Sequence, residues 1–171
     1  MYIQLKKDTT FVVLIFVYTI MKIEDVIKSN LNLAIEKKTL LNVMYSQNVI
    51  SEKFNELLKP FDLSAEQFNV LRILRGQNGK ATNMCNIQER MIAKTSNTTR
   101  LVDKLLAKEL VTREICPNNR RKMEITITQK GLRLLKKLDP LVINHEKCFA
   151  KNLTESELIT LNELLEKFRT V

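Results

Sequence analysis

The sequence predicts a mainly α-helical protein that contains one small β-hairpin. Its 171 residues include only three Gly, three Pro and no Trp, which favours helices, and the length suits one domain with a substantial core. Over most of the chain, apolar residues recur at steps of three and four, as they do on one face of a helix. Between residues 111 and 128 they alternate with polar residues instead, which indicates a pair of strands.

The first 20 residues stand apart from this pattern. The apolar run from Phe11 to Met21 is shorter than the roughly 20 residues that a membrane-spanning helix needs, and no small-residue cleavage site of a signal peptide follows it. Three interpretations of residues 1–20 stay open: an extension upstream of a start at Met21, a buried dimer contact, or a weak membrane anchor. We favour the first.

Residues 21–60 are predicted to form an N-terminal helical region. From Ile23 to Leu58 apolar side chains recur mostly at helical spacing, with a slip near Lys37, so this segment is one long helix or two in succession. Pro60 ends it, because proline lacks the backbone N–H that a continuing helix requires.

A pair of short helices joined by a tight turn is predicted next. Ser64 and Gln67 have the spacing of a capping box, which begins a helix that ends in the glycine-containing turn 76–79. Two shorter helical patterns, over residues 83–91 and 95–110, then lie only a few residues apart, and the second is polar at its start and apolar later. This arrangement is typical of a DNA-binding helix-turn-helix.

Two strands, residues 110–115 and 122–128, are predicted to flank a cationic turn. The Pro-Asn-Asn stretch turns the chain, so Arg120, Arg121 and Lys122 are expected at the tip of the hairpin. A hairpin tip gains no stability from a cluster of like charges, whereas the negative potential of a narrow minor groove attracts arginine. The hairpin is therefore interpreted as the wing of a winged helix-turn-helix domain.

Two further helices are predicted toward the C-terminus. Thr128 caps the first, and Thr154 with Glu157 forms a second capping box before the last. The apolar residues of the last helix are expected to face inward: Leu158, Leu161, Leu164, Leu165 and Phe168. We therefore predict a winged helix-turn-helix domain over residues 61–137 that is flanked by N- and C-terminal dimerisation helices, the latter over residues 138–171, in one intertwined domain.

The positive charge is confined to one part of the chain. Residues 80–137 hold 14 Lys or Arg against five Asp or Glu, so this segment carries the whole net charge of +9 and the remainder is neutral. A lysine-rich solvated surface would spread its charge evenly. A concentrated excess suits a polyanionic partner, here double-stranded DNA.

The cysteines and the single histidine exclude several classes of site. Cys85, Cys116 and Cys148 have no CxxC spacing and His145 is the only histidine, which argues against a zinc site or a Cys–His nucleophile. Reduced thiols in a cytoplasmic protein are expected, with Cys85 and Cys148 packed in helices and Cys116, near Arg120, as a candidate redox-reactive thiol. No paired acid and base and no phosphate loop appear, so neither an enzyme nor a cofactor is indicated.

Four segments carry a resemblance to a known family. In order within residues 24–170, "LSAEQFNVLRIL", "TSNTTRLVDKLLAKELVTRE", "NNRRK" and "ITITQKGLRLL" resemble segments of the MarR family of bacterial transcriptional regulators. The resemblance implies a homodimer whose first and last helices intertwine, with a recognition helix in the major groove and the wing in the adjacent minor groove. It also implies a small apolar or phenolic effector that binds between the two subdomains and weakens DNA binding.

The predicted DNA-contacting residues form two groups. Short hydroxyl and amide side chains at the start of the recognition helix can reach base edges, and Thr95 or Ser96 can also cap that helix. Arg100 and Lys104 lie one helical turn apart and can reach phosphates, unless Asp103 pairs with them locally. The recognition-helix group is Thr95, Ser96, Asn97, Thr98, Thr99, Arg100 and Lys104. The wing group is Asn118, Asn119, Arg120, Arg121 and Lys122.

Two positions depart from the family pattern. Asn119 stands where the family has Asp before the Arg pair, so a neutral amide replaces the carboxylate that would orient a wing arginine. Glu109 stands where the family commonly has Gly, and it suggests an altered turn. A redox-sensing branch of the family uses a cysteine in its opening helix. This chain has none there, so peroxide sensing is not assigned.

Together these features predict a sequence-specific, homodimeric DNA-binding regulator, specifically a ligand-relieved repressor of a pseudo-palindromic operator. The alternative is a winged-helix module for protein–protein interaction, associated with a membrane through residues 1–20. Salt-dependent binding to duplex DNA separates the two, since only the first predicts it. A membrane partner is not favoured.

Overall fold

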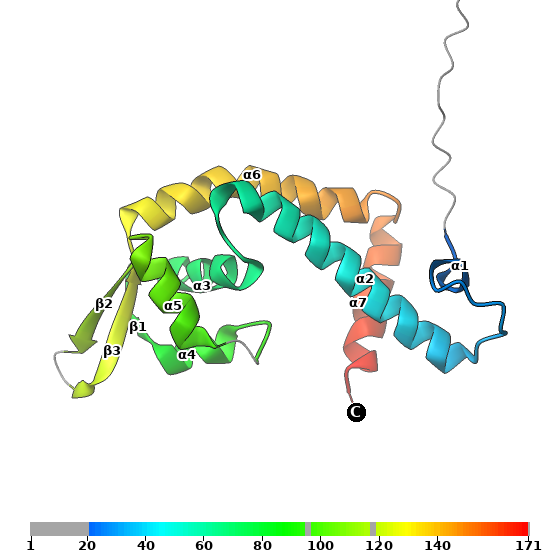
Figure 1. Ribbon diagram of the computed structural model, residues 1–171, viewed down its shortest axis with the longest axis horizontal. Helices are drawn as coiled ribbons and strands as arrows, with labels where there is room; N and C mark the ends of the chain where they lie inside the picture. The colour runs from blue at the N-terminus through cyan, green and yellow to red at the C-terminus, as the bar shows by residue number, and fades with distance from the viewer. Residues whose placement is uncertain (1–20, 95–96, 117–118, 171) are drawn as a thin grey trace, which may run out of the picture. The chain divides into compact units, whose positions relative to one another are not determined.

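The computed structural model describes residues 21–94, 97–116 and 119–170. The apolar segment 1–20 lies outside them. Apart from one short strand, β1, the order of helices and strands follows the prediction (Figure 1). The elements are α1 (Ile23–Val26), α2 (Ile35–Leu58), the 3-10 turn η1 (Lys59–Phe61), α3 (Ala65–Arg75), β1 (Thr82–Asn83), α4 (Met84–Arg90), α5 (Thr98–Ala107), β2 (Val111–Cys116), β3 (Asn119–Ile127), α6 (Gln129–Ala150) and α7 (Glu155–Phe168).

The chain divides into two compact units, Met1–Tyr45 and Ser46–Val171. In the described part of the first unit, the helical pattern that starts at Ile23 proves to be two helices, the short α1 and the beginning of α2. Lys38 pairs with Glu24 at 2.7 Å, and this hydrogen bond lowers the pKa of the Glu24 carboxyl. The helix α2 ends at Leu58, because Pro60 occupies the first turn of η1.

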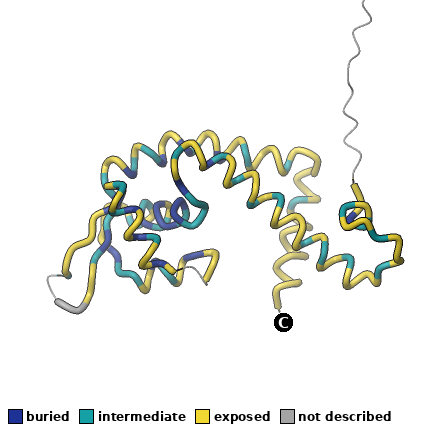
Figure 2. The backbone as a smooth tube through the Cα atoms, viewed as in Figure 1, coloured by how far each residue is buried: buried dark blue, intermediate teal, exposed yellow. Residues whose placement is uncertain are grey.

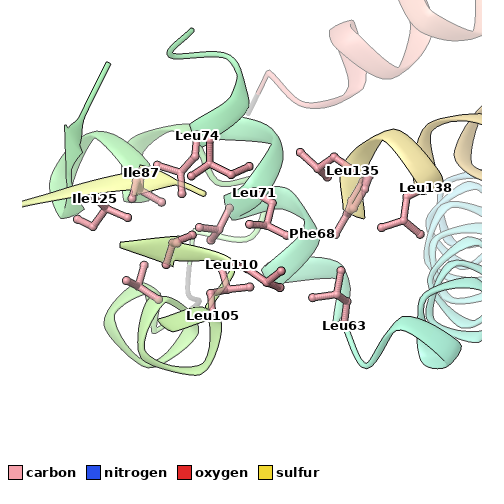
Figure 3. Close-up of a cluster of buried hydrophobic side chains, with 14 of the residues drawn as sticks. Leu63, Phe68, Leu71, Leu74, Ile87, Leu105, Leu110, Ile125, Leu135 and Leu138 are labelled. Atoms are coloured by element: carbon pink, nitrogen blue, oxygen red, sulfur yellow. The ribbon is translucent and has the colours of Figure 1, made fainter. Parts of the chain in front are cut away.

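The second unit holds a continuous hydrophobic core (Figure 3). Most of its buried side chains come from α3 to α6 and from the two long strands, as the apolar periodicity predicts, and Leu58 at the end of α2 and a few residues of the connecting segments complete it. The labelled members in Figure 3 are Leu63, Phe68, Leu71, Leu74, Ile87, Leu105, Leu110, Ile125, Leu135 and Leu138. Arg75 of α3 also donates to both carboxylate oxygens of Asp139 at 2.9 Å, which ties α3 to α6.

The sheet has three antiparallel strands in the order β1-β3-β2. The alternating residues of β3 behave as predicted at its base, where Ile125 and Ile127 are buried. The strand β1 was not predicted, because its two residues are too short to show a period. It forms only by pairing, with Thr82 opposite Ile125 and Asn83 opposite Glu124.

Three of the predicted helix caps are present. Ser64 and Gln67 form a capping box at α3, and Thr154 and Glu157 form another at α7. At α6, the hydroxyl of Thr128 accepts from the backbone N–H of Gly131 at 3.1 Å. These interactions lie within four consecutive residues, which is why their spacing alone was sufficient to find them.

Two predictions about packing are wrong for the single chain. The helix α7 has no buried residue, and Leu161, Leu164, Leu165 and Phe168 are exposed (Figure 2). Cys85 and Cys148 are exposed as well, and all three cysteines are free thiols. The apolar pattern of a helix identifies the face to be covered, but not whether the same chain covers it.

None of the helices in the described ranges is long and apolar enough to span a membrane.

Candidate nucleic-acid interface

Hydrogen bonds of one side chain of α4 hold α5, the predicted recognition helix, in place. The Gln88 carbonyl accepts from the hydroxyl of Thr98, the first residue of α5, and its amide nitrogen donates to the backbone oxygen of Lys94 at 2.6 Å. Lys94 in turn donates to the carbonyl of Glu89. One glutamine thus fixes both the turn and the start of α5. This role could not be predicted from the sequence, because a lone Gln on a helix carries no pattern.

The start of α5 is capped by Asn97. Its side-chain oxygen accepts from the backbone N–H of Arg100 at 3.1 Å. The expectation that Thr95 or Ser96 caps this helix is therefore wrong; both of those residues lie outside the described ranges. The sequence offers several consecutive residues that can cap, so spacing alone could not select among them.

The predicted recognition residues fall into buried and exposed members. Thr98 is only 4% exposed and bonded to Gln88, so it positions the helix and does not face outward. Thr99, Arg100 and Lys104 are exposed. Short polar and cationic side chains on one exposed stretch can meet base edges and phosphates.

Asp103 does not neutralise the cations of α5. Its carboxylate accepts from Arg113 of β2 at 2.7 Å, an ion pair that joins the recognition helix to the wing. In the part of the chain that the structure describes, Arg100 and Lys104 form no ion pair. The local pairing considered from the sequence is therefore replaced by a contact across two elements, and both cations remain available.

The recognition helix ends in a turn that usually contains glycine. Leu110 N–H donates to the Leu105 carbonyl at 3.0 Å and Glu109 N–H donates to the Leu106 carbonyl at 2.8 Å, the Schellman pattern. Glu109 adopts a φ of 58°, the left-handed conformation that glycine favours. The turn expected to be altered is thus kept despite the glutamate. Lys130 donates to the Glu109 carboxylate at 2.8 Å and lowers its pKa.

The start of α6 packs tightly against this same turn. The Leu110 carbonyl accepts from Thr128 N–H at 3.0 Å, and the Thr128 hydroxyl donates to the Glu109 carbonyl at 2.8 Å. A Cβ atom on Gly131 would lie 2.4 Å from the Leu110 oxygen. Only glycine fits there, which gives a physical reason for the Thr-x-x-Gly sequence at the opening of α6.

The wing is a two-stranded extension from the helices (Figure 1). Its second strand begins at Asn119, earlier than the predicted Lys122, and Cys116 lies opposite Asn119. Arg120 and Arg121 therefore stand at the start of β3 and not in the turn itself. Lys122 is exposed, whereas Asn118 lies outside the described residues.

The described residues contain no group of three or more His, Cys, Asp or Glu residues that could hold a metal ion. One open pocket of about 830 Å³ lies beside α5. It is lined by carboxylates from α2, by Lys104 of α5 and by Lys108 directly after α5, among other residues.

Comparisons with known proteins agree with this architecture. The MarR family model matches residues 63–123. The chain is 30% identical to the HTH-type transcriptional repressor IacR of Pseudomonas putida, over 71% of this chain and 69% of that protein. It is 31% identical to the multiple antibiotic resistance protein MarR of Escherichia coli, over 66% of this chain and 78% of that protein.

Solved structures extend the match to three dimensions. A MarR transcription factor from Planctomyces limnophilus is 30% identical, with a TM-score of 0.63, and the match covers 80% of this chain and 98% of that one. A mutant MarR from E. coli complexed with operator DNA is 26% identical, with a TM-score of 0.69, over 81% of this chain and 99% of that one. The chain therefore belongs to the MarR family of transcriptional regulators, which bind operator DNA.

Proposed function

We propose that this protein is a homodimeric repressor that binds a pseudo-palindromic operator and is released from it by a small ligand. The observation that carries the proposal is that Arg100 and Lys104 are exposed, and form no ion pair within the described residues, on a helix that Gln88 and Asn97 hold in position. Such cations on a fixed helix can pair with DNA phosphates, because no ion pair within the protein has to be broken first. The wing group, from Asn118 to Lys122, is proposed as the second contact.

The proposed homodimer is supported by apolar surface that the single chain leaves exposed. In the second unit, eight of the large apolar side chains that are exposed come from the later part of α6 and from α7: Leu141, Ile143, Phe149, Ile159, Leu161, Leu164, Leu165 and Phe168. Exposed apolar side chains in this number on two consecutive helices favour an interaction site. A second copy of the chain would cover it and would place two recognition helices on the same duplex, about one helical turn apart.

The pocket beside α5 is our candidate position for the ligand. Its walls come from α2, from the segment between η1 and α3, and from α5, so a bound molecule would contact the recognition helix directly. Lys104 lines this pocket and is also a proposed phosphate contact. A ligand that engages Lys104 would therefore compete with DNA for the same ammonium group. The ligand chemistry implied by the family resemblance is apolar or phenolic.

The salt dependence of DNA binding tests the proposal. Replacing Lys104 with Ala should remove one phosphate interaction per protomer, and the slope of log K against log salt should fall by about 0.9 for each phosphate that is no longer neutralised. Lys136→Ala, which removes an exposed cation of α6 outside the proposed interface, is the matched control and should leave the slope unchanged. Equal slopes for the Lys104 variant and the unaltered protein would overturn the assignment of α5 as the recognition helix.

A further inference from the structure

The outer part of the wing carries an exposed apolar pair. Ile115 on β2 lies opposite Met123 on β3, and the two residues are 59% and 38% exposed. Because side chains alternate along a strand, this pair shares a face with Arg113 and Ile125. Ile125 is fully buried at the base of the hairpin. The pair therefore continues the buried apolar stripe beyond the core, into solvent.

This face of the wing is turned toward the recognition helix. Arg113 lies one strand repeat before Ile115 on the same face, and its guanidinium reaches Asp103 of α5 at 2.7 Å. The opposite face presents Glu114 directly across from Glu124. Phosphates would repel that carboxylate pair, which favours a DNA contact on the face that carries Ile115 and Met123.

We propose that Ile115 and Met123 pack against the deoxyribose groups of the DNA strand that runs between the groove occupied by α5 and the groove occupied by the wing. This inference rests on the proposed operator binding and adds a non-ionic contact to it. The sugars present C–H surface, which exposed apolar side chains can remove from water. Their burial stabilises the complex without releasing counterions.

Charge complementarity favours DNA as the partner of the wing. Lys122, the neighbour of Met123 in β3, is exposed on the opposite face of the strand, and residues 80–137 carry the whole net charge of the chain. Two copies of such a positively charged segment would repel each other. A second protomer is thus a poor partner for the wing, whereas a polyanion with apolar sugars between its charges fits both the cations and the exposed pair.

Ile115→Thr and Met123→Thr test the inference in the full-length protein. Threonine keeps a high preference for strands but removes most of the apolar surface. With one operator duplex and a series of salt concentrations, each variant should bind roughly three- to tenfold more weakly than the unaltered protein. The salt slope should stay the same, because every cation that faces a phosphate is kept. The melting temperature should also stay the same, because both side chains are exposed.

Glu114→Gln is the matched control, since it changes the neighbouring residue of β2 on the opposite face. It should not weaken binding. The inference is overturned if Ile115→Thr and Met123→Thr bind operator as well as the unaltered protein does. It is also overturned if their loss of affinity accompanies a changed oligomeric state in sedimentation, which would make the pair a protein–protein contact. If the unaltered protein bound no duplex, the proposed function itself would fail, a result distinct from these.

Discussion

Gly131 offers the sharpest test of how the recognition helix, the wing and α6 are joined. A Cβ atom at this position would lie 2.4 Å from the Leu110 carbonyl oxygen and 2.8 Å from Cγ1 of Ile127. The Leu110 oxygen is held by Thr128 N–H at 3.0 Å, and Ile127 is buried, so neither neighbour can move freely. The start of α6 would have to shift by about 1 Å to restore ordinary contact.

Gly131→Ala should therefore destabilise the protein even though alanine favours helices. The helical preference contributes about 1 kcal/mol in favour of alanine. Overpacking typically costs about 1–3 kcal/mol, and a clash with a fixed backbone oxygen belongs at or beyond the upper end of that range. We expect a net loss of about 2 kcal/mol in the free energy of unfolding, or roughly 4–8 °C in melting temperature for a chain of this length.

Urea unfolding followed by far-ultraviolet circular dichroism measures this loss. Protein concentration must be held constant, because dimerisation makes apparent stability depend on it. Gly76→Ala is the matched control: its nearest neighbours to an added Cβ are carbonyl oxygens at 3.4 and 3.6 Å, so it should change stability by less than about 0.5 kcal/mol. If Gly131→Ala were as stable as the unaltered protein, the tight packing of α6 on the Leu110 turn would be wrong.

Three further predictions concern caps and turns. Asn97→Ala should cost about 1 kcal/mol in urea unfolding and weaken DNA binding, whereas Asn97→Ser should retain the cap; equal stability of the two variants would contradict this. Glu109→Gly should raise the melting temperature, because it relieves the left-handed backbone and gives up only an exposed ion pair with Lys130; a lower value would show that the pair dominates. Hydrogen bonds from Thr154 lower the pKa of the Glu157 carboxyl from its ordinary value of 4.5. The stability that these hydrogen bonds contribute is therefore fully present above pH 4.5, and it is lost as the pH falls through the lower pKa of this carboxyl in the folded protein. Thermal melts of Glu157→Gln and the unaltered protein should therefore converge in acid, and a constant difference would refute this.

Local interactions were predictable from the sequence because each is encoded within a few residues. The capping boxes at Ser64 and Thr154 and the cap at Thr128 all form at the expected positions. The helical and alternating patterns also located the core helices and the wing strands, since burial of one face imposes a period.

Interactions between distant residues were not predictable in this way. The pair of Asp103 and Arg113 joins a helix to a strand, and the bond of Gln88 to Thr98 joins two helices. Neither produces a periodic signal. The burial of Thr98 likewise depends on how α4 and α5 pack, so the pattern of residues predicts the same outward role for it as for Thr99.

The apolar pattern of α7 predicted a packed helix face but not the chain that covers it. Its residues have the spacing of a packed helix, yet Leu164 and Phe168 are exposed in the single chain. The apolar pattern of a helix indicates that one face must be covered, but it does not indicate which chain covers that face. The proposed dimer supplies one.

Operator recognition is tested most directly by selecting bound sequences from a pool of random duplex DNA with the full-length protein. We predict enrichment of an inverted repeat whose half-sites are centred about 10 base pairs apart, because two recognition helices related by two-fold symmetry would read it. Recovery of unenriched random sequence, or of a single half-site without symmetry, would contradict sequence-specific binding by a homodimer.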